Sequence, residues 1–141
     1  MKSQLTLLAA AIALALGTSV QAAADTKQIN EQHKAEVAKC KDLKGNAKDV
    51  CKKEADGKQK VAKAEAELKE HDTAKNRLKV DEAKADAHYG VAKERCDDQK
   101  GDAKDACQKA AKAERDGAIA QAKKASLDSE GKTKQPRAKK E

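Results

Sequence analysis

The sequence predicts an all-α protein with a small core, and three observations support this prediction. The chain has no Phe, no Trp and one Tyr, so few large side chains can fill an interior. It has one Pro, 39% of its residues are charged, and it is rich in Ala, Lys and Glu, which favour helices. Beyond residue 22, four Leu, five Val and two Ile supply the large aliphatic side chains. We therefore expect about four helices with narrow apolar stripes, arranged as two disulfide-linked hairpins in a loose bundle or an extended form.

Residues 1–22 have the pattern of a secretory signal peptide. Lys2 is the only charge, an almost unbroken apolar run covers residues 5–16, and Val20-Gln21-Ala22 is a small-x-small cleavage sequence. A membrane anchor is the alternative, but about twelve helical residues span about 18 Å, which is short of a hydrocarbon core of about 30 Å. We expect cleavage after Ala22 or Ala24, a periplasmic location, and no membrane insertion of the mature chain.

The four cysteines lie in a duplicated segment. Residues 40–51 and 96–107 each begin and end with Cys, and they are identical at eight of twelve positions with an offset of 56 residues. Such self-similarity indicates an internal repeat. Because an even number of cysteines in an exported chain favours disulfides, we expect Cys40, Cys51, Cys96 and Cys107 to be paired.

Each repeat also contains the signals of a helix-turn-helix. Gly45 and Gly101 follow helix-forming residues, where a glycine with positive φ ends a helix. Asn46 and Asp102 come next and are candidate N-caps, with an aspartate three residues further on that would complete a capping box. The chain is therefore expected to reverse direction at both glycines.

Three disulfide arrangements remain open. In a tight hairpin the two cysteines of one repeat lie at equal distances from the turn, which favours Cys40–Cys51 and Cys96–Cys107. An unbroken helix would instead separate residues eleven apart by about 16 Å, too far for a disulfide. Crossed pairing, Cys40–Cys107 with Cys51–Cys96, would then apply. Intermolecular or reduced cysteines are the third arrangement.

Helical segments flank both turns and define two hairpins, residues 23–70 and 71–125. Strong helix composition predicts helices over about residues 25–44 and 47–70 in the first hairpin. His71-Asp72-Thr73 interrupts the pattern and supplies a cap for a third helix that extends to about Lys100. A fourth helix is expected over about residues 103–125.

Residues 126–141 have the composition of a disordered basic tail. From residue 131 onward there are five Lys or Arg and one Glu, and these basic residues form a weak candidate anion-binding set: Lys132, Lys134, Arg137, Lys139 and Lys140. No aromatic residue is interleaved with them for base stacking, so we expect no nucleic-acid binding.

The sequence contains no recognisable catalytic motif, and we expect no enzyme activity, no cofactor and no metal site. His33, His71 and His88 lack the short spacings of zinc ligands and are expected to be solvated. The cysteines are eleven residues apart rather than in a Cys-x-x-Cys motif.

The repeated Cys segments, followed by Ala/Lys/Glu runs over residues 40–66 and 96–122, resemble a group of exported Ala/Lys-rich proteins of Gram-negative bacteria. Some of these are labelled as cell-envelope or TolA-like proteins. The resemblance implies helical form and a periplasmic location. We therefore expect a non-catalytic structural or interaction protein of the cell envelope, with self-association or an envelope protein as its partner. The alternative is an exported protein that buffers redox state, or binds metal or anions, through its Cys pairs or basic tail.

Overall fold

The computed structural model describes residues 18–133, with side chains described over residues 25–131. This part of the chain forms four α-helices and no strand: α1 Thr18–Lys39, α2 Gly45–Glu70, α3 Ala74–Cys96 and α4 Asp102–Thr133. A short 3-10 helix, η1 (Cys40–Asp42), follows α1 directly. The prediction of an all-α protein with four helices is confirmed.

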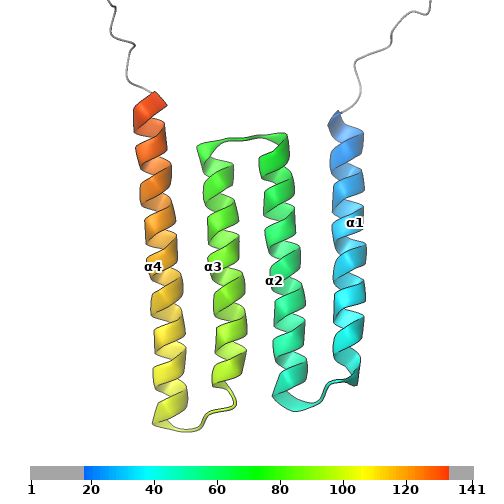
Figure 1. Ribbon diagram of the computed structural model, residues 1–141, viewed down its shortest axis with the longest axis vertical. Helices are drawn as coiled ribbons and strands as arrows, with labels where there is room; N and C mark the ends of the chain where they lie inside the picture. The colour runs from blue at the N-terminus through cyan, green and yellow to red at the C-terminus, as the bar shows by residue number, and fades with distance from the viewer. Residues whose placement is uncertain (1–17, 134–141) are drawn as a thin grey trace, which may run out of the picture.

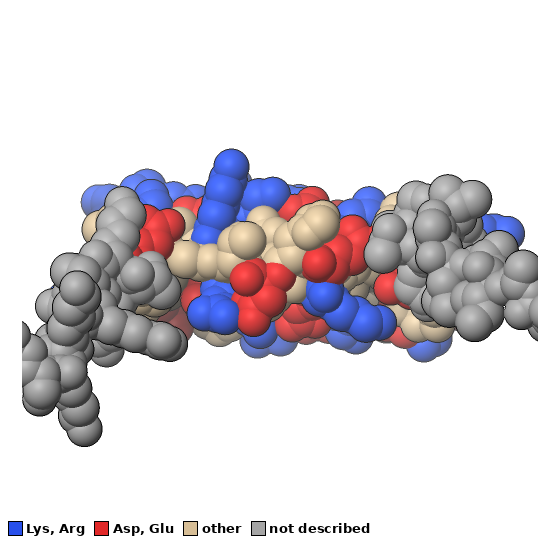
Figure 2. Space-filling view, turned by 90° about the horizontal axis from the view of Figure 1, so that it is seen from above, with Lys and Arg blue, Asp and Glu red and all other residues tan. Residues whose placement is uncertain are grey.

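The four helices lie side by side in a single antiparallel layer (Figure 1). Each helix packs only against its neighbours in the sequence, and within the described residues no Cα atoms of non-neighbouring helices approach within 8 Å. Seen from above, the molecule is wide and thin, with charged side chains along both long edges of its outline (Figure 2). Of the two predicted arrangements, the extended one is therefore present.

Both predicted hairpin turns contain a glycine in the left-handed conformation. Gly45 has φ 56° and Gly101 has φ 57°, and no other residue of the described range has a positive φ. A Cβ at such a position would meet the adjacent carbonyl oxygen, at a cost of about 1–2 kcal/mol. The two glycines therefore reverse the chain as predicted.

The helices that precede these turns are shorter than predicted. α1 changes to η1 at Cys40, and Leu43 and Lys44 are extended with ψ of 154° and 157°. α3 ends at Cys96. The expectation that these helices continue to Lys44 and Lys100 is wrong, because the chain needs non-helical residues ahead of the glycine to bring the next helix alongside.

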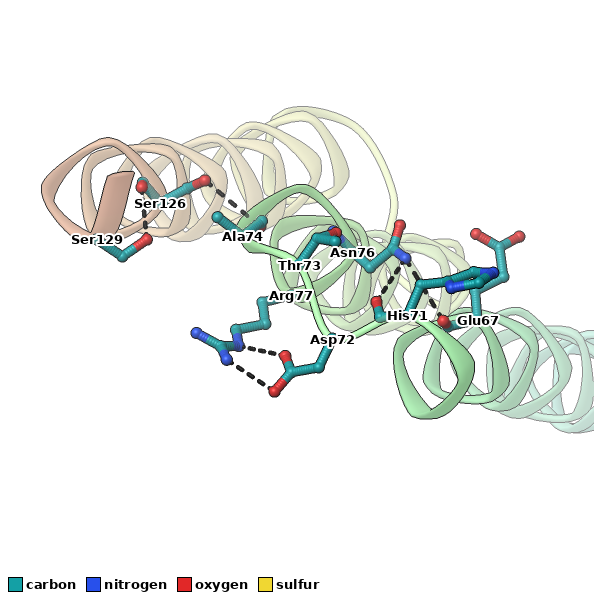
Figure 3. Close-up of polar contacts among 9 residues, drawn as sticks. All are labelled: Glu67, His71, Asp72, Thr73, Ala74, Asn76, Arg77, Ser126 and Ser129. Atoms are coloured by element: carbon teal, nitrogen blue, oxygen red, sulfur yellow. Dashed lines mark hydrogen bonds and ion pairs between the residues drawn. The ribbon is translucent and has the colours of Figure 1, made fainter. Parts of the chain in front are cut away.

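The α2–α3 turn, residues 71–73, is held by polar side chains rather than by a disulfide (Figure 3). Thr73 Oγ1 accepts a hydrogen bond from the Asn76 backbone N–H at 3.1 Å, which confirms the predicted cap. Asn76 Nδ2 donates to the His71 carbonyl at 2.8 Å. Arg77 donates through two nitrogens to the Asp72 carboxylate, at 2.7 and 2.8 Å. These bonds fix the reversal between the two hairpins.

α4 continues through Thr133, so the expectation of disorder from Ser126 onward is wrong for residues 126–133. Ser126 Oγ donates to the Ala74 carbonyl at 3.4 Å, which ties this part of α4 to the first turn of α3 (Figure 3). Ser129 Oγ donates to the Ser126 carbonyl at 2.7 Å. At the other end of the chain, α1 begins within the predicted signal peptide, and residues 1–17 lie outside the described range.

Few side chains are buried in this layer, and a buried glycine lies in the contact between α2 and α3. The buried hydrophobic residues of the described range are small, except for one valine: Cys40, Ala55, Val80, Cys96 and Ala111. Gly57 on α2 is also buried and lies against Ala87 on α3. A Cβ built on Gly57 would lie 2.8 Å from the Ala87 Cβ, so the glycine allows the two helices to approach.

We expect Gly57→Ala to lower the free energy of unfolding by about 1–3 kcal/mol, because the added methyl overpacks the α2–α3 contact. Thermal unfolding followed by circular dichroism measures the effect. Gly117→Ala is the matched control, because a Cβ at this position meets nothing within 4 Å. The higher helix propensity of Ala should stabilise this variant by about 0.5–1 kcal/mol. Ala87→Gly should restore part of the stability that Gly57→Ala removes. Equal effects of the two glycine substitutions would contradict the close contact.

Candidate functional site

The two disulfides are local and close the two hairpin turns. Cys40 bonds to Cys51 and Cys96 bonds to Cys107, each with a Cα–Cα distance of 5.6 Å. The favoured pairing is confirmed and the crossed pairing is wrong. Within each pair the first cysteine is buried and the second is half-buried, so the bond lies between the two helices of its hairpin.

The sequence predicts that Asn46 caps its helix, but in the structure Asn46 links the two hairpins instead. α2 begins at Gly45 without a side-chain cap, and Asn46 Nδ2 instead donates to the Glu94 carbonyl at 2.7 Å, near the end of α3. The same carbonyl also accepts the Asp97 backbone N–H at 3.0 Å, so Asn46 adds a second donor, from the other hairpin, at the end of α3. Asp102 is the first residue of α4, so its predicted position ahead of the helix is also wrong, although its charge suits the helix N-terminus.

An apolar groove follows the α2–α3 contact on one broad face of the layer. Its volume is about 500 Å³, and its apolar lining includes Gly57, Val61, Ala87 and Val91. Val61 and Val91 are only half-buried, because no further element covers this face within the described range. We call this feature the seam groove.

Two cross-helix ion pairs border the seam groove. Arg95 Nη2 on α3 donates to Glu54 Oε1 on α2 at 3.0 Å. Lys84 Nζ on α3 lies 3.2 Å from Glu65 Oε1 on α2. The side chains of both pairs are 43–64% exposed. In these pairs α2 supplies the acids and α3 supplies the bases.

The opposite face of the same contact is polar. A groove of about 390 Å³ there is lined by three lysines and three acids: Lys53, Lys60, Lys93, Asp56, Asp86 and Glu94. Successive residues of an α-helix are rotated by about 100° about the helix axis. Lys60 and Glu65 therefore lie on opposite sides of Gly57 around α2. Because the charges balance, this groove has no preference for ligands of one sign. The two broad faces therefore differ in polarity.

In each hairpin, one histidine contacts an acidic side chain of the adjacent helix. His33 Nε2 lies 2.7 Å from Asp56 Oδ1, between α1 and α2. His88 Nδ1 lies 3.8 Å from Glu114 Oε1, between α3 and α4. The His33 side chain is only 22% exposed, so the expectation of a solvated residue is wrong for it. Over residues 18–133 no group of three or more His, Cys, Asp or Glu side chains is placed to hold a metal ion.

Exposed carboxylates take part in ion pairs along the layer. The hydrogen bond from Lys39 at 2.7 Å holds the pKa of Glu36 below its ordinary value, and Lys58 on α2 adds to this effect. Neighbouring cations lower the pKa of three more carboxylates by hydrogen bonding: Asp72 from Arg77, Asp97 from Lys104, and Asp116 from Lys112. Arg115 also lies over the Tyr89 ring, 4.7 Å from its centroid. The surface is thus a network of paired charges.

The structure brings together the predicted cysteines and glycines, whereas the predicted basic set lies outside the described side chains. Lys132 lies in α4 where side chains are not described, and the other members lie outside the described residues: Lys134, Arg137, Lys139 and Lys140. The seam groove was not predicted from the sequence. A signal was present, because a glycine inside a helical pattern often marks close packing, and Val61 follows Gly57 by one helical turn.

Comparisons with protein families, curated proteins and solved structures found no match to this chain. None of the helices in the described range is both long enough and apolar enough to cross a membrane. The function is therefore inferred from the fold, its covalent links and its surfaces.

Removing one disulfide is expected to destabilise the fold substantially. Replacing Cys40 and Cys51 together by Ser should lower the free energy of unfolding by about 3 kcal/mol, since the bond closes a loop of about twelve residues. The same change at Cys96 and Cys107 should have a similar effect, because the two bonds have equal sequence separation. Urea unfolding followed by circular dichroism measures both. An unchanged midpoint in either variant would show that helix packing alone supports its hairpin.

Acid is expected to weaken the fold below about pH 4. The folded-state pKa values of Glu36, Asp72, Asp97 and Asp116 are depressed. Their contribution to stability is therefore fully present above the unfolded values of about 3.9 for Asp and 4.3 for Glu, and is lost as the pH falls through the folded values. The melting temperature should fall steadily from pH 5 to pH 2, and by less in 0.5 M NaCl, which screens the same pairs. A melting temperature independent of pH over this range would contradict the role of these pairs.

Proposed function

We propose that this chain is a non-catalytic structural or interaction protein of the bacterial cell envelope, exported to the periplasm and stabilised by its two disulfides. The single observation that carries this proposal is that each duplicated hairpin is closed by its own disulfide, in a layer with very few buried side chains. A fold that depends on disulfides persists in an oxidising compartment. The leader-like residues 1–22 and the resemblance to exported Ala/Lys-rich proteins support the same location.

A structural role agrees with how the reactive side chains are used. All four cysteines are bonded to one another, so none offers a free thiol. His33 and His88 contact acids of the adjacent helix, which links them to the packing of the hairpins. The grooves on the two faces are open, whereas small-molecule sites enclose most of their ligand. These features suit a rigid surface better than a catalytic centre.

The test is to express the chain with its own leader in a Gram-negative host and to analyse the osmotic-shock fraction. We expect a chain that has lost residues 1–22 or 1–24 and is four hydrogen atoms lighter than its reduced form. Non-reduced peptide mapping should recover Cys40 with Cys51 and Cys96 with Cys107. The bonds should also resist mild thiol reductants, as structural disulfides do.

Two outcomes would overturn the proposal. A chain that keeps its leader and its free thiols in the cytoplasm would contradict an exported scaffold. Disulfides that are readily reduced and re-formed at the redox potential of the compartment would instead support the redox-buffering alternative. The variant with all four cysteines replaced by Ser is the matched control for export, because it keeps the same leader.

A further inference from the structure

No element of residues 18–133 covers the seam groove, and this is the unusual feature of the fold. Soluble domains are built from at least two packed layers, because a helix must bury its apolar stripe against another element. Here Val61 and Val91 line an open groove of about 500 Å³ on one face of a single layer. We propose that a second copy of this chain covers the groove, so that two layers pack face to face with α2 of one copy on α3 of the other.

The face is large enough for a stable dimer. α2 has 26 residues and is therefore about 39 Å long, and four helices spaced about 9 Å apart make a face of about 1,400 Å². A typical specific interface needs about 800 Å² from each partner. The surface of α2 and α3, with part of each outer helix, therefore provides enough area for such an interface. Because the apolar lining lies at the centre and the charges lie at its border, the groove has the arrangement of an interface core and rim.

The border charges select one orientation of the second copy. A two-fold axis parallel to the helices places α2 on the partner's α3. The acids Glu54 and Glu65 then face the bases of the partner copy, because the bases Arg95 and Lys84 are both on α3. An axis perpendicular to the helices would place α2 on α2, with Glu54 facing Glu65. Since like charges in contact destabilise an interface, the first orientation is favoured.

Lys58 and His88, in the middle of the border, do not oppose this arrangement. Lys58 Nζ lies 3.3 Å from Glu36 Oε2 of α1, and His88 lies 3.8 Å from Glu114 of α4. Each is therefore paired with an acid of the outer helix in its own hairpin. This leaves the apolar lining between them available to the second copy.

The outer helices α1 and α4 do not have the residues to repeat the α2–α3 contact between copies and so build a longer assembly. The repeat offset of 56 residues relates Gly57 to Ala113 on α4, and Ala87 to Glu31 on α1. Ala113 and Glu31 are both exposed. If α4 of one copy packed against α1 of the next, the charged Glu31 would lie at the position that the methyl group of Ala87 has in the α2–α3 contact. We therefore expect a closed dimer rather than a filament.

Sedimentation velocity on the purified, oxidised chain tests the proposal, and a dimer is expected. Val61→Lys places a charge in the covered groove and should weaken dimerisation by at least about 100-fold while the helical circular dichroism spectrum is kept. Ala113→Lys is the control, since it makes a similar change on the exposed edge of α4 and should leave the dimer intact. A wild-type chain that sediments as a monomer, or a dimer lost in Ala113→Lys but not in Val61→Lys, would overturn the proposal.

Glu65→Lys tests the orientation and serves equally if Val61→Lys does not fold. In the proposed dimer it faces Lys84 of the second copy and should raise the Kd by about tenfold. Adding Lys84→Glu should restore the affinity. With α2 on α2, Lys at position 65 would face Glu54 and tighten the dimer instead, which would overturn the orientation. This inference goes beyond the proposed function and fails separately from it, because an exported monomer with both disulfides would still be a scaffold.

Discussion

The structure depends on two covalent constraints, the disulfides that close the α1–α2 and α3–α4 turns. A layer one helix thick buries little apolar surface, so hydrophobic burial cannot by itself offset the conformational entropy of ordering about 110 residues. A disulfide reduces this entropy difference by restricting the unfolded chain, and by the chain-entropy account it does so without needing a core. Each bond also holds the Cα atoms of its two cysteines 5.6 Å apart, which aligns the two helices of the hairpin.

The contact between the two hairpins is non-covalent and depends on small residues. Gly57 and Ala87 let α2 and α3 approach, and Asn46 donates a hydrogen bond to the Glu94 carbonyl at one end of this contact. At the other end, the α2–α3 turn is fixed by Thr73, Asn76 and the Asp72–Arg77 pair. Close approach increases dispersion contacts between backbones, so an Ala-rich stripe can hold two helices together despite its small area.

The duplication has been specialised according to position in the layer. Asn46 corresponds to Asp102 in the second repeat, and an aspartate carboxylate has no proton to donate to a carbonyl. The first position faces the neighbouring hairpin, and the second lies at the outer edge, where no such carbonyl is present in the described range. Similar sequences thus form similar hairpins, but only the inner surfaces have the residues for packing against another hairpin.

The sequence by itself determined the helical class, the two turns at Gly45 and Gly101 and the Thr73 cap, and it favoured the local disulfides over the other pairings, because each depends on residues that are close in the chain. It misplaced the helix end near residue 126, because the Ser126–Ala74 bond joins residues 52 apart. Only the tertiary structure decided that the hairpins form an open layer, that Asn46 reaches α3, and that Val61 and Val91 line one groove. Their positions depend on how α2 and α3 rotate about their own axes, and in a uniformly charged, Ala-rich sequence no local pattern specifies that rotation.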